Sequence, residues 1–313
     1  MVAENSSADK SLILPSDLVA EAGRKIFAGQ VRRMRRQEVG SRTGEDIESV
    51  HRMRVAIRRM RSLLKLIPDY YQAGTVSKLE RGLRDIARAL GGIRDLDVLI
   101  LDLENYATTL PPDQQAHIQA VIDRLDRRRR NRRDRLNALF DSKSYATFLR
   151  QLRRFGKTPG KGARRIKRRS APQQLRHVLP LLLHQRMAQV KAYDVVLPSS
   201  DINDLHELRV EFKQLRYAVE FFQPVLGSSA GRFLQSVRTM QDFLGRINDI
   251  SVFMESVSRL KKLRPAEAAA LENYRAALKA EQDRLRDQFD ELWTRFNNRA
   301  TQRLFSDSLL VLR

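Results

Sequence analysis

The sequence predicts an all-α protein built as two four-helix bundles that arose by internal duplication. Apolar residues recur at helical spacing along most of the 313-residue chain, and alternating β-branched runs are scarce. Two motifs also occur twice, at an offset of about 155 residues. Because this period is far longer than a solenoid repeat, each copy is expected to be a domain-sized bundle.

The two repeated motifs keep their order and spacing. The first reads HRMRV from His51 and HELRV from His206, and each copy continues to a base seven residues on, an arginine ten residues on and a closing proline. The second reads LGGIRD over 90–95 and LGRIND over 244–249. Two blocks that recur in register, with one residue of slippage, indicate a duplicated unit.

Periodicity and turn residues divide each copy into helices. In the first copy helices are expected over 16–39, 46–67, 75–106, 113–140 and 144–155. In the second copy they are expected over 172–195, 201–223, 229–262 and 265–297. The Gly91–Gly92 pair marks a point where the third helix can break or kink.

The same patterns predict the domain organisation. The prediction is a flexible N-terminus over 1–15, a first bundle over 16–155, a basic linker over 156–171 and a second bundle over 172–313. The linker contains glycine and several bases, a composition typical of a connection between packed units.

The charge balance points to a polyanionic partner. The chain has 59 Lys and Arg against 37 Asp and Glu, a net charge of +22, and 46 of the 59 bases are arginine. The planar guanidinium group suits phosphate oxygens and keeps its charge at physiological pH. Nucleic acid, an anionic lipid surface and a phosphate polymer all fit, and composition does not choose among them.

Several classes of function are excluded or disfavoured. The absence of cysteine excludes disulfides, thiolate metal sites and a cysteine nucleophile. No P-loop, Gly-rich dinucleotide fingerprint, HExxH or GxSxG motif occurs. The start resembles no signal peptide and no stretch is apolar for 18 residues. We therefore expect a cytoplasmic protein that is no enzyme, needs no cofactor and does not bind membranes.

The His–Arg helices each carry a basic stripe opposite an apolar face. On a helical wheel the first stripe spans an arc of about 80°, and it consists of His51, Arg54, Arg58, Arg61 and Lys65. Its apolar face consists of Met53, Ile57, Met60, Leu63, Leu64 and Ile67. The second stripe consists of His206, Arg209, Lys213 and Arg216, opposite Leu208, Phe212, Leu215, Val219 and Phe222. Glu220 stands where the first stripe has Lys65.

Like charges three and four residues apart repel on a helix, so the stripes need a compensating negative charge. A bound polyanion could supply it. Acids of neighbouring helices are the structural alternative, and the candidates are Glu80, Asp85, Asp95 and Asp97. The double occurrence of the stripe in a chain short of acids favours binding.

Further bases recur at matched positions outside the stripes. On the third helix of each copy Lys78 corresponds to Arg232 and Arg84 to Arg238, and on the first helix Arg36 aligns with Lys191. Lys78 and Arg84 lie six residues apart, about 240° around the helix. Only one of them can face the stripe, and we favour Arg84 and Arg238.

A metal site is not expected, since both motif histidines stand among cations that repel a metal ion. Asp95 and Asp249 are interpreted as partners that orient the basic stripes. The densest basic run, RLDRRRRNRRDRL over 124–136, occurs once and is interpreted mainly as solvated surface, although it could touch nucleic acid.

These motifs resemble those of the CHAD domain family, the conserved-histidine α-helical domains. The resemblance covers about residues 16–310 and rests on His51-x-x-Arg54-Val55 with Arg58 and Arg61, on Leu90-Gly91-x-x-Arg94-Asp95, and on their second copies. It implies two four-helix bundles related by a pseudo-twofold axis, with a basic surface or pore between them. Asn248 departs from the pattern, because it stands where Arg94 does in the first copy.

The resemblance also implies a function. Such domains bind inorganic polyphosphate and localise to polyphosphate granules, so the basic stripes are expected to contact the polymer and to place the protein on granules. Non-specific nucleic-acid binding is the alternative, especially at low salt. A third reading is a scaffold whose basic face recruits acidic, granule-associated proteins.

Overall fold

The computed structural model describes residues 12–165, 172–195 and 201–312. Its secondary structure confirms the predicted all-α class, since no strand occurs within these ranges. The first half contains α1 (Val19–Arg36), α2 (Glu38–Thr43), α3 (Ile47–Leu66), α4 (Ala73–Ala107), α5 (Pro112–Asp141) and α6 (Lys143–Lys157). The second half contains α7 (Leu175–Lys191), α8 (Ile202–Phe222), α9 (Ser229–Ser258), α10 (Pro265–Phe296) and α11 (Arg299–Leu309).

The two His–Arg helices begin at aspartate caps. The Asp46 carboxylate accepts a hydrogen bond from the Glu48 backbone N–H at 2.8 Å and starts α3. Asp201 and Asp204 form a capping box at the start of α8. Such caps satisfy backbone N–H groups that have no partner inside the helix. Both helices start four residues before the motif histidine.

Most helix ends lie within four residues of the prediction, and three features differ from it. α4 runs unbroken through Gly91 and Gly92, the pair at which the sequence allows a break or kink. The segment predicted as one helix over 16–39 is followed by a separate short helix, α2. A further helix, α11, begins after Asn298, whose side chain accepts from the Thr301 backbone N–H at 2.8 Å.

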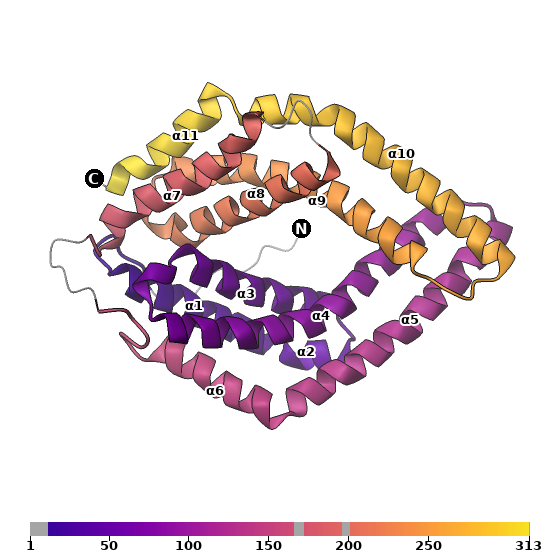
Figure 1. Cartoon of the computed structure of the whole chain (residues 1–313), viewed down its shortest axis with the longest axis horizontal. Helices are drawn as coiled ribbons and strands as arrows, with labels where there is room; N and C mark the ends of the chain where they lie inside the picture. Colours follow the sequence, from indigo (N-terminus) through magenta and orange to yellow (C-terminus); the bar gives the residue numbers. More distant parts are fainter. Residues whose placement is uncertain (1–11, 166–171, 196–200, 313) are drawn as a thin grey trace.

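The His–Arg helices lie beside each other at the centre of the molecule. Figure 1 shows α3 and α4 next to α8 and α9, with α5 and α6 along one outer edge and α10 and α11 along the other. The predicted apolar faces of α3 and α8 are buried in one large cluster, which also takes in α1, α4, α7 and α9. Burying these faces directs the opposite, basic faces outward.

A second buried cluster lies where the long helices of both halves meet. It combines the C-terminal part of α4 with the N-terminal part of α5, and the C-terminal part of α9 with the N-terminal part of α10. Figure 1 shows these four segments converging at the end opposite the C-terminus. Arg246 of α9 joins the halves here, because its guanidinium contacts Asp102 of α4 and Glu281 of α10, each at 2.7 Å.

Both buried clusters combine helices of the two halves. The division into bundles over 16–155 and 172–313 therefore stays a prediction. Residues 1–11 of the predicted flexible N-terminus and 166–171 of the predicted linker lie outside the described residues. None of the helices described has the length and apolar character that crossing a membrane requires.

Candidate functional site

The packing of α3 against α8 brings the two basic stripes together. Lys213 of α8 shows this most clearly. Its pKa is lowered to about 8, first by burial and then by the charges of Arg209, Arg58, Lys65 and Arg54. Residues of both motif copies therefore surround one ammonium group. We call Arg54, Arg58, Lys65, Arg209 and Lys213 the cation cluster.

Arg209 lies in the same environment. Burial is the largest effect that lowers its pKa, and the charges of Arg58 and Arg54 lower it further. Asp249 of α9 acts in the opposite direction. This agrees with the expectation that Asp249 supports the second stripe, although the pKa of Arg209 stays below its usual value.

His51 borders the cation cluster on α3. Burial lowers its pKa most, followed by the charge of Arg94, and Arg58 and Arg54 add to the effect. Glu48 opposes the shift. Glu48 is also the ion-pair partner of Arg94, at 3.7 Å. The pKa of His51 therefore lies below the usual histidine value.

Acids compensate part of the basic surface, as the structural alternative required. Asp95 binds Arg54 at 3.0 Å. Of the other predicted acids, Asp97 binds Arg129 of α5 at 3.3 Å and Asp85 lies 4.0 Å from Arg88. Among the described residues, none of these carboxylates pairs with Arg58 or Lys65, so the cluster keeps several uncompensated charges.

Glu220 of α8 brings a negative charge to the contact of α3 with α8. It forms ion pairs with Arg59 of α3, with Arg216 at 3.8 Å and with Arg238 of α9 at 3.2 Å. Arg216 and Arg238, both predicted to bind the anion, thus share an acid. Because Glu220 stands where the first copy has Lys65, the two motif copies differ in charge at this position.

Tyr217 forms an aromatic support beneath three arginines. Its ring centroid lies 5.7 Å from the guanidinium carbon of Arg58, 5.5 Å from that of Arg59 and 5.3 Å from that of Arg216. Cation–π contacts of this kind hold guanidinium groups in place. Neither Tyr217 nor Arg59 was predicted as a site residue, and in the sequence they stand out only by their position beside Arg216 and Arg58.

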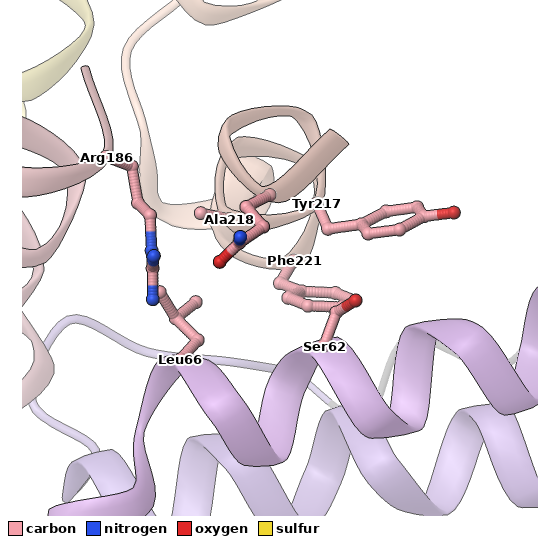
Figure 2. Close-up of a pocket in the computed structure, with 7 residues that line it drawn as sticks. Ser62, Leu66, Arg186, Tyr217, Ala218 and Phe221 are labelled. Carbon is pink, nitrogen blue, oxygen red and sulfur yellow. The ribbon is translucent and has the colours of Figure 1, made fainter. Parts of the chain in front are cut away.

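The described residues of α3, α7 and α8 enclose one small space where these helices meet. Figure 2 shows Ser62 and Leu66 of α3 opposite Phe221 of α8, with Arg186 of α7 alongside and the Tyr217 ring pointing away from it. The space they enclose measures about 10 Å³, at the lower limit for one water molecule. A polymeric ligand would therefore lie along the surface and not enter this contact.

His206 has a different environment from His51. It is exposed, and its Nδ1 donates a hydrogen bond to the Asn248 side-chain oxygen at 2.6 Å. Asn248 occupies the position of Arg94, so a neutral amide replaces a guanidinium beside the second histidine. Both residues border a hollow of about 320 Å³ between α8 and α9.

For the other residues predicted to bind a polyanion, that role stays a prediction. Arg61 and Lys191 are half-buried. The exposed members of this set are Arg36, Lys78, Arg84 and Arg232. Among the described residues, no group of three or more His, Asp or Glu side chains is arranged to hold a metal ion.

Comparisons with known proteins agree with this architecture. The model of the CHAD domain family matches residues 25–258. A crystal structure of the CHAD domain from the plant Ricinus communis is similar, with a TM-score of 0.72 and 23% identity over 91% of this chain and 93% of that one. PptA from Streptomyces chartreusis has a TM-score of 0.66 and 14% identity over 89% of this chain and all of that one. At these identities the two structures show a shared fold.

No curated protein matches the chain in a sequence search. The family model covers well over half of the chain and includes both His–Arg motifs and both LG motifs. The protein therefore belongs to the CHAD domain family.

Proposed function

We propose that the protein binds inorganic polyphosphate along the α3–α8 surface, without catalysing a reaction, and that this binding places it on polyphosphate granules. The observation that carries the proposal is the environment of Lys213. Burial lowers its pKa most, and the charges of four cations from two helices lower it further, to about 8. The site is thus short of negative charge. A chain of phosphates would supply that charge.

The chemistry of the cluster suits a linear phosphate polymer. Such a polymer carries about one negative charge per phosphate and has no nucleobases that a protein could recognise. Guanidinium groups bind phosphate oxygens through charge-assisted hydrogen bonds, often two at a time. The cation–π contacts of Arg58 and Arg216 with Tyr217 restrict these side chains before any ligand arrives.

Nucleic acid is less well supported as the partner. Binding of single strands relies on exposed aromatic side chains on which bases stack. The large exposed apolar side chains of the described residues are aliphatic, and Tyr217 is buried. Exposed arginines of α5, such as Arg127, Arg128 and Arg130, could still attract nucleic acid at low salt.

The decisive experiment is calorimetric titration with long-chain polyphosphate at about 150 mM salt, with double-stranded DNA as competitor. The test variant is Arg58→Ala/Arg209→Ala, and the matched control is Arg128→Ala/Arg135→Ala, which removes the same charge from exposed positions of α5. At about 1.5 kcal/mol per lost charged hydrogen bond, the test variant should bind roughly 100-fold more weakly. Circular dichroism verifies the fold of both variants.

Each outcome has a clear meaning. Binding that DNA does not displace, and that only the test variant loses, supports the proposal. An equal loss of polyphosphate affinity in both double variants would mean that the polymer binds through general surface charge and not at a specific site. Preferential binding of DNA would favour the nucleic-acid function, and binding of neither polymer would favour recruitment of an acidic protein.

A further inference from the structure

Tyr217 carries an unpartnered hydroxyl at the contact between the two His–Arg helices. The side chain is 1% exposed, and its oxygen has no hydrogen-bond partner among the described residues. Figure 2 shows the ring pointing away from Arg186 and Leu66, with the hydroxyl at its outer end. Burial lowers the pKa of Arg209 most, and the Tyr217 oxygen is close enough to oppose that effect. The hydroxyl therefore lies near the cation cluster.

The groups that surround the ring are donors as well. The Nε atoms of Arg58, Arg59 and Arg216 are buried and without a hydrogen-bond partner among the described residues. The three guanidinium carbons lie 5.3 to 5.7 Å from the ring centroid of Tyr217. Four buried donors of the described residues thus share one place, although buried polar groups are normally hydrogen-bonded.

Glu220 does not meet this need for acceptors. One of its oxygens accepts from Arg59, and the other accepts from Arg238 at 3.2 Å. The second oxygen lies 3.8 Å from the Arg216 Nε, which is beyond hydrogen-bond distance. The donors around Tyr217 therefore need a further anionic group with several acceptor atoms.

We infer that the Tyr217 hydroxyl, together with Arg58, binds a phosphoryl group. Such a group offers several charged oxygens, which match a set of donors that lacks acceptors. A cation–π contact with Tyr217 holds Arg58, and no hydrogen bond or ion pair with a described residue does. When Arg58 turns from the ring towards a phosphate, it uncovers the hydroxyl, which donates to an oxygen of the same phosphate.

This inference rests on the proposed function in one respect only. Under that function the phosphoryl group is a unit of polyphosphate. Free orthophosphate offers the same chemistry, and the two sources are distinguished below.

The test variant is Tyr217→Phe, which removes the hydroxyl and keeps the ring that contacts the arginines. The wild-type protein and the variant are compared by calorimetric titration with long-chain polyphosphate at about 150 mM salt. Loss of one hydrogen bond to a charged group should weaken binding about tenfold. The matched control is Tyr106→Phe in the second buried cluster, which should bind like the wild-type protein. Equal affinity of the wild-type protein and Tyr217→Phe overturns the inference.

The stability of the free protein separates a binding role from a structural one. An unpartnered buried donor costs free energy, so Tyr217→Phe should be at least as stable as the wild-type protein in urea unfolding. A hydroxyl that instead bonds an ordered water as part of the fold gives the opposite result. Lower stability with unchanged affinity would therefore overturn the inference.

A double-mutant cycle tests whether Tyr217 and Arg58 hold the same phosphoryl group. If they do, Arg58→Ala/Tyr217→Phe should lose less affinity than the two single variants lose together. Arg128→Ala on α5 is the control for Arg58→Ala, and its effect should add to that of Tyr217→Phe. Additive effects of Arg58→Ala and Tyr217→Phe would overturn joint binding.

Titration with orthophosphate distinguishes the source of the phosphoryl group and tests the proposed function separately. A wild-type protein that binds orthophosphate through Tyr217 but binds no polyphosphate would contradict the proposed function and leave the inference intact. Tight polyphosphate binding that Tyr217→Phe leaves unchanged would do the reverse. Weaker binding of polyphosphate alone by Tyr217→Phe would identify the phosphoryl group as a unit of the polymer.

Discussion

Arg59 of α3 and Glu220 of α8 form an ion pair across the contact of the two His–Arg helices, although 161 residues separate them in the sequence. Both side chains are mostly buried, with 16% and 11% of their surface exposed. Burial lowers the pKa of Arg59 and Glu220 opposes that effect. The pair therefore joins α3 to α8 next to Arg58 of the cation cluster.

Glu220→Gln should destabilise the protein, because it leaves Arg59 buried without its counter-charge. Loss of one partner of a buried ion pair costs about 3 kcal/mol, and here Arg216 and Arg238 lose the same acid. The free energy of unfolding in urea measures the effect. The control is Glu291→Gln, which breaks an exposed pair with Arg295 on α10. Equal stability of the two variants would contradict the role given to Glu220.

The local features of the His–Arg helices could be predicted from the sequence. The 3.6-residue period places Met53, Ile57 and Met60 on one face of α3, and all three are fully buried. The basic stripe follows from the same period, because the basic residues lie on the helix face opposite the apolar one. Burial of Leu208 and Phe212 in α8 repeats the argument in the second copy.

The relations between helices could not be predicted in this way. Periodicity says which face of a helix is apolar but not which helix covers it. Glu220, Arg59 and Tyr217 acquire their roles only when α3 packs on α8. The pair Gly91–Gly92 was interpreted as a weak point of its helix, whereas Gly92 faces the Arg132 side chain of α5, which a larger residue would meet.

Polyphosphate binding should weaken as the pH rises through the pKa of Lys213, which is about 8. Above that pH the free protein loses the Lys213 proton, and the bound polymer, which favours the charged amine, must take it up again. Between pH 7 and pH 9 the affinity should therefore fall about tenfold. Titration in two buffers of different ionisation enthalpy measures both the affinity and the proton uptake.

Lys213→Arg is the control for this alkaline step, because guanidinium keeps its charge over the whole range. Its affinity should be constant from pH 7 to pH 9. If the wild-type protein and Lys213→Arg lose affinity in parallel, another group is responsible.

At acid pH the binding should strengthen as His51 gains its proton. Burial, Arg94, Arg58 and Arg54 all lower the pKa of His51, and Glu48 only partly opposes them. The midpoint of the increase in affinity should therefore lie below pH 6.5, which is the pKa of an unperturbed histidine. Binding measured from pH 7 to pH 5 tests this. His51→Gln should remove the rise, and an unchanged pH profile in that variant would show that His51 does not contact the polymer.

Arg246→Met should destabilise the contacts of α4 with α9 and α10, at the end of the molecule opposite the C-terminus, without affecting the basic surface. Arg246 donates two hydrogen bonds to Glu281 and one to Asp102, all at 2.7 Å, while Tyr274 donates to the other Asp102 oxygen. These contacts join α4 of the first half to α9 and α10 of the second. Without the guanidinium, two partly buried carboxylates lose their cation, which costs about 3 kcal/mol.

Urea unfolding measures this loss, and polyphosphate titration at pH 7 provides the second readout. Arg275→Met is the matched control, because it breaks an exposed pair with Glu272 on α10 that is worth less than about 1 kcal/mol. Arg246 takes no part in the cation cluster, so Arg246→Met should bind polyphosphate with wild-type affinity at temperatures where it is folded. A folded Arg246→Met variant with weakened binding would mean that the far end helps to set the contact of α3 with α8.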